Sequence, residues 1–123
     1  MERNLLIVSR DNFLREMVRL ALRDLPVAIH SASDAASAAA LSVRLRPDCT
    51  LLLGAAPLLG GGREAEALRA CRCGGSKLLV VAWQHAEQTV LGLLENGVDQ
   101  YMAFPVNLRR LRSKVASLTG CRV

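Results

Sequence analysis

This chain of 123 residues has the length of a single domain, and 51% of its residues are hydrophobic although only 3% are aromatic. Its core must therefore consist mainly of leucine, valine, alanine and isoleucine, a composition that suits an α/β fold. No uncharged apolar run approaches the ~18 residues of a membrane span, and the N-terminal apolar stretch is too short for a signal peptide, so we expect a cytoplasmic protein with no membrane contact.

The net charge of +5 is concentrated at the C-terminal end of the chain. Residues 107–123 contain no acid, and their basic residues account for the whole net charge. These are Arg109, Arg110, Arg112, Lys114 and Arg122. A solvated helix face is the simplest interpretation, but such a stretch can also meet an acidic partner or nucleic acid.

The four cysteines do not form a metal-binding pattern. Cys71 and Cys73 form a C-x-C pair with no second pair to complete a zinc site, and Cys49 and Cys121 are isolated. We expect free thiols in a reducing compartment, no metal and no cofactor.

The first part of the chain alternates short apolar runs with helical patterns. Residues 5–8 form a buried-type strand, after which Asp11 or Asn12 can cap a helix that ends at Pro26. The apolar positions of this helix are Phe13, Leu14, Met17, Val18, Ala21, Leu22 and Leu25. A second strand over 27–30 follows.

The same alternation continues to the end of the chain. Ser33 and Asp34 cap an alanine-rich helix that reaches Leu45, and a third strand spans 49–53. Later strands are predicted over 77–82 and 99–103, and later helices over 63–71, over 87–95 with an Asn96-Gly97 end, and after the Asn107 cap. Five strand–helix units with short connections indicate a parallel sheet that is covered by helices on both sides.

Over essentially its whole length the chain resembles the receiver domain of bacterial two-component response regulators. The segments that carry the resemblance are NLLIVSRD, RPDCTLLLGAAPLLGG, LLVVA and NGVDQYMAFPVNLRRL. The resemblance implies a flavodoxin-like (βα)5 fold with strand order 2-1-3-4-5. It also implies one receiver-like domain over 1–123, either a stand-alone adaptor or the N-terminal part of a longer regulator with a DNA-binding output domain.

The resemblance places four chemical roles on residues that cannot perform them. The phospho-acceptor aspartate falls on Leu53, which has no nucleophilic atom. The magnesium-binding acids fall on Ser9 and Arg10, the phosphoryl-sensing threonine or serine on Ala82, and the lysine before the proline on Phe104. Asp11, the remaining acid, is explained by helix capping. Because phosphoryl transfer needs a carboxylate and a metal ion, we expect neither phosphorylation nor enzyme activity.

Two features of this end of the sheet leave alternatives open. Tyr101 matches the aromatic residue whose rotamer reports activation in the family, and Pro105 matches a proline that is often cis, yet Tyr101 can equally be an ordinary half-buried aromatic residue. Leu53, Ala82, Trp83 and Phe104 either fill the former acidic pocket or line an apolar pocket for a small molecule.

In the family, the face formed by the fourth helix, fifth strand and fifth helix commonly dimerises or docks an output domain. Here that face would have acids on one side and bases on the other, which a two-fold dimer could pair. Its residues are Glu87, Gln88, Leu91, Glu95, Asp99, Tyr101, Arg109, Arg110, Arg112 and Lys114.

We therefore expect a phosphorylation-independent pseudo-receiver that acts as a protein-interaction or dimerisation module in signal transduction or transcription regulation. The alternatives are a small-molecule sensor that uses the apolar pocket, and nucleic-acid binding through the basic last helix.

Overall fold

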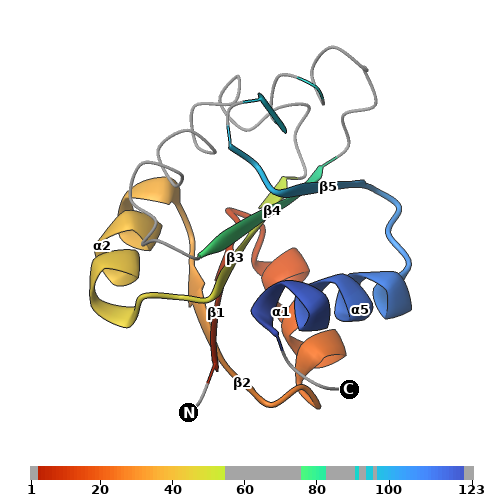
Figure 1. Cartoon of the computed structure of the whole chain (residues 1–123), viewed down its shortest axis with the longest axis horizontal. Coiled ribbons are helices and arrows are strands. Elements are labelled where there is room, and N and C mark those ends of the chain that lie inside the picture. The colour runs from red at the N-terminus through yellow and green to blue at the C-terminus, as the bar shows by residue number, and fades with distance from the viewer. Residues whose placement is uncertain (1–2, 55–75, 83–90, 92–93, 96, 121–123) are drawn as a thin grey trace.

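The computed structural model describes residues 3–54, 76–82, 91, 94, 95 and 97–120. One sheet of parallel strands has the order β2-β1-β3-β4-β5 (Figure 1). The strands are β1 (Arg3–Val8), β2 (Val27–Ala32), β3 (Cys49–Gly54), β4 (Lys77–Ala82) and β5 (Gln100–Ala103). This order confirms the predicted flavodoxin-like topology, with β3 at the centre of the sheet.

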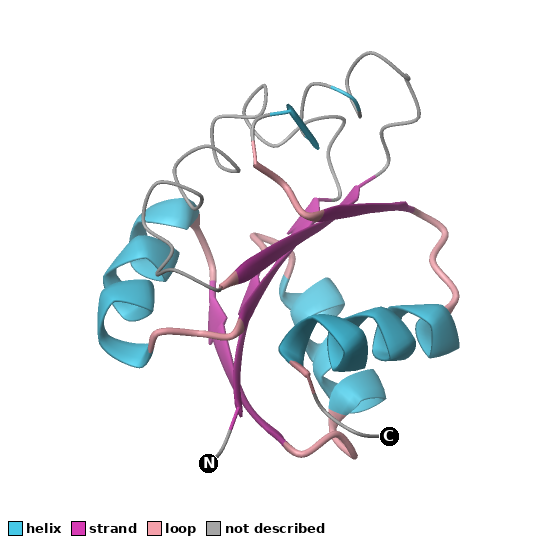
Figure 2. Ribbon diagram, viewed as in Figure 1, coloured by secondary structure: helices cyan, strands magenta, loops and turns pink. Residues whose placement is uncertain are grey.

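Helices lie on both faces of the sheet (Figure 2). α1 (Asn12–Leu22) and α5 (Leu108–Thr119) cover one face, and α2 (Ala35–Leu45) covers the other. The predicted helix over 63–71 lies outside the described residues, whereas residues 91, 94 and 95 of the one predicted over 87–95 are helical. Gly97 has φ 98° and its N–H donates to the Leu94 carbonyl at 3.3 Å, which confirms the predicted end of that helix.

The core consists of two apolar clusters, one on each face of the sheet. Successive residues of a strand point to opposite faces, so a strand that is buried on both sides is apolar along most of its length. The cluster beneath α1 and α5 takes Leu51 and Leu53 from β3, and the cluster beneath α2 takes Leu52. The continuous apolar runs of the sequence are therefore required by the central position of the strands.

Polar side chains fix where three helices begin. The Asp11 carboxylate accepts from the Phe13 and Leu14 N–H groups at 2.9 and 3.2 Å. Asp34 accepts from Ser37 N–H at 2.7 Å, and Asn107 accepts from Arg109 N–H at 2.9 Å. These bonds confirm the predicted caps and show that Asp11, not Asn12, caps α1.

The apolar face predicted for the first helix is wrong at one position. The Phe13 side chain is 73% exposed, whereas Val18 and Leu22 are fully buried. Residues five apart on a helix lie about 140° apart around its axis, so Phe13 points away from the sheet when Val18 points toward it. Within the described parts of the chain, no helix is long and apolar enough to cross a membrane.

Candidate functional site

Parallel pairing brings the ends of four strands to one edge of the sheet. Leu53 is opposite Val81, and Ala82 is opposite both Gly54 and Ala103. Ser9 follows β1 directly and Phe104 follows β5 directly. Every residue onto which the resemblance places phosphoryl chemistry therefore lies at this edge, which is where α/β proteins usually bind ligands.

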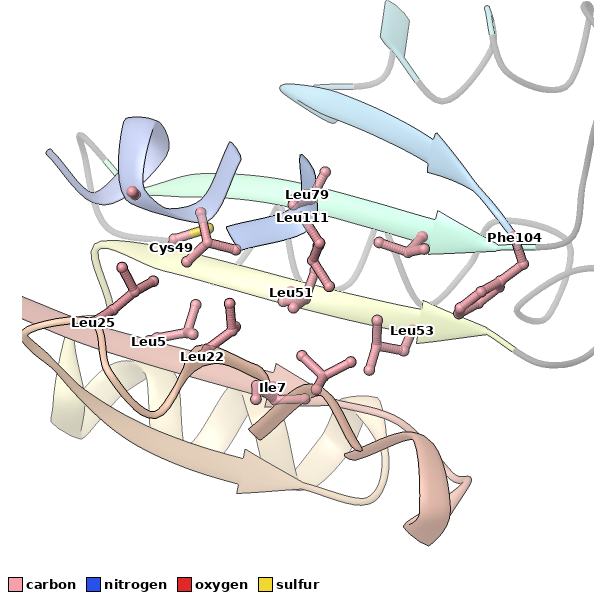
Figure 3. Close-up of a cluster of buried hydrophobic side chains, with 14 residues drawn as sticks. Leu5, Ile7, Leu22, Leu25, Cys49, Leu51, Leu53, Leu79, Phe104 and Leu111 are labelled. Carbon is pink, nitrogen blue, oxygen red and sulfur yellow. The ribbon is translucent and has the colours of Figure 1, made fainter. Parts of the chain in front are cut away.

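Leu53 and Phe104 belong to the hydrophobic core. Their side chains are 1% and 4% exposed and share the cluster beneath α1 and α5 with Ile7 and Val81. Figure 3 shows the Phe104 ring beside the end of β3, close to Leu53. The position of the expected phospho-acceptor is thus occupied by packed hydrocarbon, which supports the filled interpretation over an open apolar pocket.

The residues that follow β1 form hydrogen bonds with the first turn of α1. Ser9 is buried, and its hydroxyl oxygen accepts from Asp11 N–H at 3.1 Å. The Arg15 guanidinium donates to the Ser9 carbonyl oxygen and, at 2.7 Å, to the Asn12 side chain. The segment that joins β1 to α1 thus carries Arg10, and the guanidinium group of Arg15 folds back onto it.

This arrangement does not fit the magnesium ion that receivers usually hold. Magnesium needs oxygen ligands that include one or two carboxylates, and the Asp11 carboxylate already accepts hydrogen bonds from the backbone at the start of α1. Positive charge on Arg10 and Arg15 also opposes a divalent cation. In the portion of the chain described by the structure, no group of three or more histidine, cysteine or acidic residues could hold a metal.

Ala82 and Tyr101 lie on the opposite face of the sheet from Leu53. Ala82 belongs to the cluster beneath α2, and Tyr101 packs against that cluster. The prediction that Leu53, Ala82, Trp83 and Phe104 fill one pocket together is wrong for Ala82, which does not share a cluster with Leu53 and Phe104. Trp83 lies outside the described residues. The Tyr101 hydroxyl donates to the Ala82 carbonyl oxygen at 3.5 Å, and burial raises the pKa of Tyr101.

The residue after Phe104 has the conformation that the resemblance implied. The Phe104–Pro105 peptide bond is cis. The Phe104 N–H donates to the Ala82 carbonyl oxygen at 3.0 Å. This hydrogen bond holds Phe104 at the end of β4, although its side chain has none of the chemistry of a lysine.

The residues of the predicted interaction face differ in their exposure to solvent. Leu91 is 48% exposed and Glu95, Arg109 and Arg110 are exposed, whereas Lys114 is half-buried. Glu87 and Gln88 lie outside the described residues.

Two members of this predicted face have partners within the chain. The Asp99 carboxylate accepts from the Leu78 N–H at 2.8 Å, so it holds the start of β4. Arg112 donates to both carboxylate oxygens of Asp24, at 3.1 and 2.9 Å, which turns it toward the end of α1 instead of the β5 side. Asp24 lies 88 positions away in the sequence, so no local pattern could have identified this pair.

Two surface hollows lie along β5 and α5. One, of about 290 Å³, is lined by residues that include Tyr101, Pro105 and Arg110. The other, of about 320 Å³, is lined by Arg109, Arg110, Ser113, Lys114 and Ser117. Arg110 lines both hollows.

The fold is that of response-regulator receiver domains. A two-component response regulator from Clostridium difficile superposes with a TM-score of 0.82 at 20% identity, covering 95% of each chain. The chemotaxis protein CheY4 of Vibrio cholerae gives 0.81 at 18% identity over 96% of this chain and 99% of that one. The receiver domain of sensor histidine kinase PA1611 from Pseudomonas aeruginosa, which holds magnesium in its active-site cleft, gives 0.78 at 20% identity over 98% and 99%.

A curated sequence relative carries the comparison further. The "Probable transcriptional regulatory protein TcrX" of Mycobacterium tuberculosis is 32% identical over 113 residues, which cover 92% of this chain. This chain spans about half of that relative, 48% of its length. No protein-family model matches the sequence.

Proposed function

We propose that this chain is a cytoplasmic pseudo-receiver domain of a bacterial two-component-type response regulator, and that it acts as a protein-interaction or dimerisation module without being phosphorylated. Its receiver fold and its similarity to a transcriptional regulatory protein support a role in signal transduction or transcription regulation. The relative is about twice as long, which leaves room there for an output domain as a partner.

The burial of Leu53 beside Phe104 is the observation that carries this proposal. A phosphoryl group can be accepted only by a nucleophilic atom, and its charge needs a cation to offset it. Leucine supplies no nucleophile, the adjoining Ser9–Arg10 segment supplies no carboxylate, and the core leaves Leu53 only 1% exposed. The surface of the fold is therefore the part that can carry a function.

Beryllium fluoride, a phosphoryl mimic for receivers, provides the test. We expect no saturable amide shifts when magnesium and beryllium fluoride are added to the isotopically labelled protein. Under the same conditions a magnesium-binding receiver such as that of PA1611 serves as the positive control. Saturable shifts around Leu53 and Tyr101 would contradict phosphorylation independence.

Self-association through the face formed by the 87–95 helix, β5 and α5 is tested separately. Glu95 and Arg110 are exposed and opposite in charge, and a two-fold axis at this face would bring each near the other on the second copy. Sedimentation should show that Glu95→Lys weakens the dimer and that the double variant Glu95→Lys/Arg110→Glu restores it. A chain that stays monomeric at high concentration would favour a different protein as partner.

A further inference from the structure

The outer face of α5 carries a compact group of cations. Arg109, Arg110 and Lys114 line the hollow of about 320 Å³ together with the hydroxyl-bearing Ser113 and Ser117. α5 has no acidic residue, and the structure gives these three cations no ion pair with any residue that it describes. The arginine that does have an internal partner, Arg112, turns away toward Asp24.

Two of these arginines stand where a helix does not favour them. The N-terminal end of a helix carries partial positive charge, so cations in its first turn are unfavourable. α1 and α2 have Arg19 and Arg44 in their last turns, and the cation in the first turn of α1, Arg15, donates to the Ser9 carbonyl oxygen and to the Asn12 side chain. In α5, Arg109 and Arg110 lie in the first turn and no basic residue lies in the last turn. The stability of the helix therefore does not explain their position, and an external anion would.

We propose that this face of α5 binds the sugar-phosphate backbone of duplex DNA. Arginine, lysine and serine are the side chains that contact phosphate oxygens in protein–DNA complexes. From Arg109 to Lys114 the helix rises ~7.5 Å, while phosphates of one strand follow each other at about 3.4 Å along the duplex axis. Three cations on this segment can therefore meet two or three consecutive phosphates.

The side chains of the hollow favour duplex DNA over other polyanions. The described residues that line this hollow are three cations and two serines, which offer positive charge and hydrogen-bond donors to an anionic ligand. A single strand would be expected to stack its bases on aromatic side chains, and there is none among the described residues that line this hollow. Backbone contact alone predicts binding that depends on salt and not on sequence.

The test uses a fluorescein-labelled 20-base-pair duplex of arbitrary sequence and anisotropy titrations between 50 and 200 mM NaCl. With three phosphate contacts, log K should fall with log salt at a slope of about −2.7, so affinity should drop about 40-fold across this range. Arg109→Glu/Arg110→Glu should abolish binding and raise the melting temperature. Lys114→Gln should reduce the slope by about one.

The matched control is Arg19→Glu/Arg44→Glu, which has the same net charge as the double α5 variant but changes other helices. It should retain most of the duplex affinity. Equal loss in both double variants would show that only the overall charge attracts DNA and would overturn the proposal, as would a slope near zero. Equal affinity for polyglutamate or for the separated single strands would also overturn it, because the surface would then serve a different polyanion.

This inference goes beyond the proposed function and can fail independently of it. Sedimentation of the same variants without DNA reports self-association, and beryllium fluoride titration reports phosphorylation. A chain that binds duplex DNA through Arg109 and Arg110 and yet responds to beryllium fluoride would retain the DNA surface and lose the pseudo-receiver assignment.

Discussion

A single side chain, Leu53, determines what the end of β3 can do. In a receiver that accepts a phosphoryl group this position must be polar and reachable, but here it is 1% exposed within a cluster that contains Ile7, Val81 and Phe104. Its hydrocarbon contributes to folding, because removing apolar surface from water stabilises the core by ~25 cal/mol per Å². Leu53 is therefore part of the packed core at this edge of the sheet.

An aspartate placed at position 53 should therefore destabilise the fold. Leu53→Ala should lower the free energy of unfolding by about 2–5 kcal/mol. Leu53→Asp should lower it further, because the carboxylate would be buried without a metal ion or cation beside it. Urea denaturation measures both, with Phe13→Asp on the exposed face of α1 as a nearly neutral control. Equal stability of the Leu53→Asp and Leu53→Ala variants would contradict the buried placement of this side chain.

The pair formed by Asp24 and Arg112 should appear in the acid titration of the protein. The hydrogen bond from Arg112 holds the pKa of Asp24 below its ordinary value. A carboxyl whose pKa is lowered by folding stabilises the fold above its unfolded pKa of ~3.9, and this contribution is lost as the pH falls through the folded pKa. In Arg112→Gln the pKa of Asp24 should rise toward the ordinary value, as read from the carboxyl carbon resonance.

Asp34 supplies the internal control for that titration. Its pKa is lowered chiefly by the hydrogen bond from the Ser37 backbone N–H, so Arg112→Gln should leave it unchanged. If Asp24 did not move while Asp34 did, the assignment of the ion pair would be wrong.

Among the helices, α5 differs from α1 and α2 in how its charges meet the helix dipole. The first two carry arginine in the last turn, where it interacts favourably with the carbonyl end. α5 begins with Asn107 accepting from the Arg109 and Arg110 N–H groups, which satisfies the backbone, but the side chains that follow are cationic. Its amphipathic face is nevertheless well buried through Leu111 and Val115.

Replacing arginine with glutamate should consequently have opposite effects on the free energy of unfolding at the start of α5 and at the end of α2. Arg109→Glu and Arg110→Glu should each raise the free energy of unfolding by about 0.5 kcal/mol, because acids are favoured in a first turn. Arg44→Glu at the end of α2 should lower it by a similar amount. Thermal unfolding at low salt measures all three, and the differences should shrink in about 1 M salt. Destabilisation by the α5 substitutions would show that the arginines stabilise the fold.

For the whole molecule, the reactivity of the Cys49 thiol measures how often the sheet unfolds. It is fully buried at the start of the central strand, opposite Leu5 of β1 and Lys77 of β4. Burial raises the pKa of its thiol to about 12, so at pH 8 the folded protein holds it protonated and out of reach of thiol reagents.

We expect this thiol to react only when the domain unfolds. In a variant in which the other cysteines, Cys71, Cys73 and Cys121, are replaced by serine, labelling at pH 8 should proceed at the global unfolding rate and accelerate in urea to the same extent. Because the unfolded chain releases the thiol proton more easily, the stability of the variant should also decline as the pH rises above about 8.5. Fast labelling of the folded protein would contradict a cooperative sheet.

The sequence by itself determined the strand order, through its resemblance to receivers, and the positions of the strands and of three helix starts. The positions of the strands and helix starts follow from local chemistry: continuous apolar runs, alternation of patterns, and capping residues that bond to N–H groups two or three positions away. It also determined that the side chains of Leu53, Ser9 and Ala82 carry no carboxylate, because a side chain's functional groups do not depend on its surroundings.

Only the tertiary structure decided which side chains meet. It placed Phe104 with Leu53 but Ala82 on the opposite face, turned Arg112 to Asp24, and directed the Asp99 carboxylate to the β4 backbone. It also left Phe13 exposed although its spacing fits the apolar stripe of α1. These outcomes depend on how strands pair and how helices lie across the sheet, and such contacts join residues far apart in the chain that no local pattern relates.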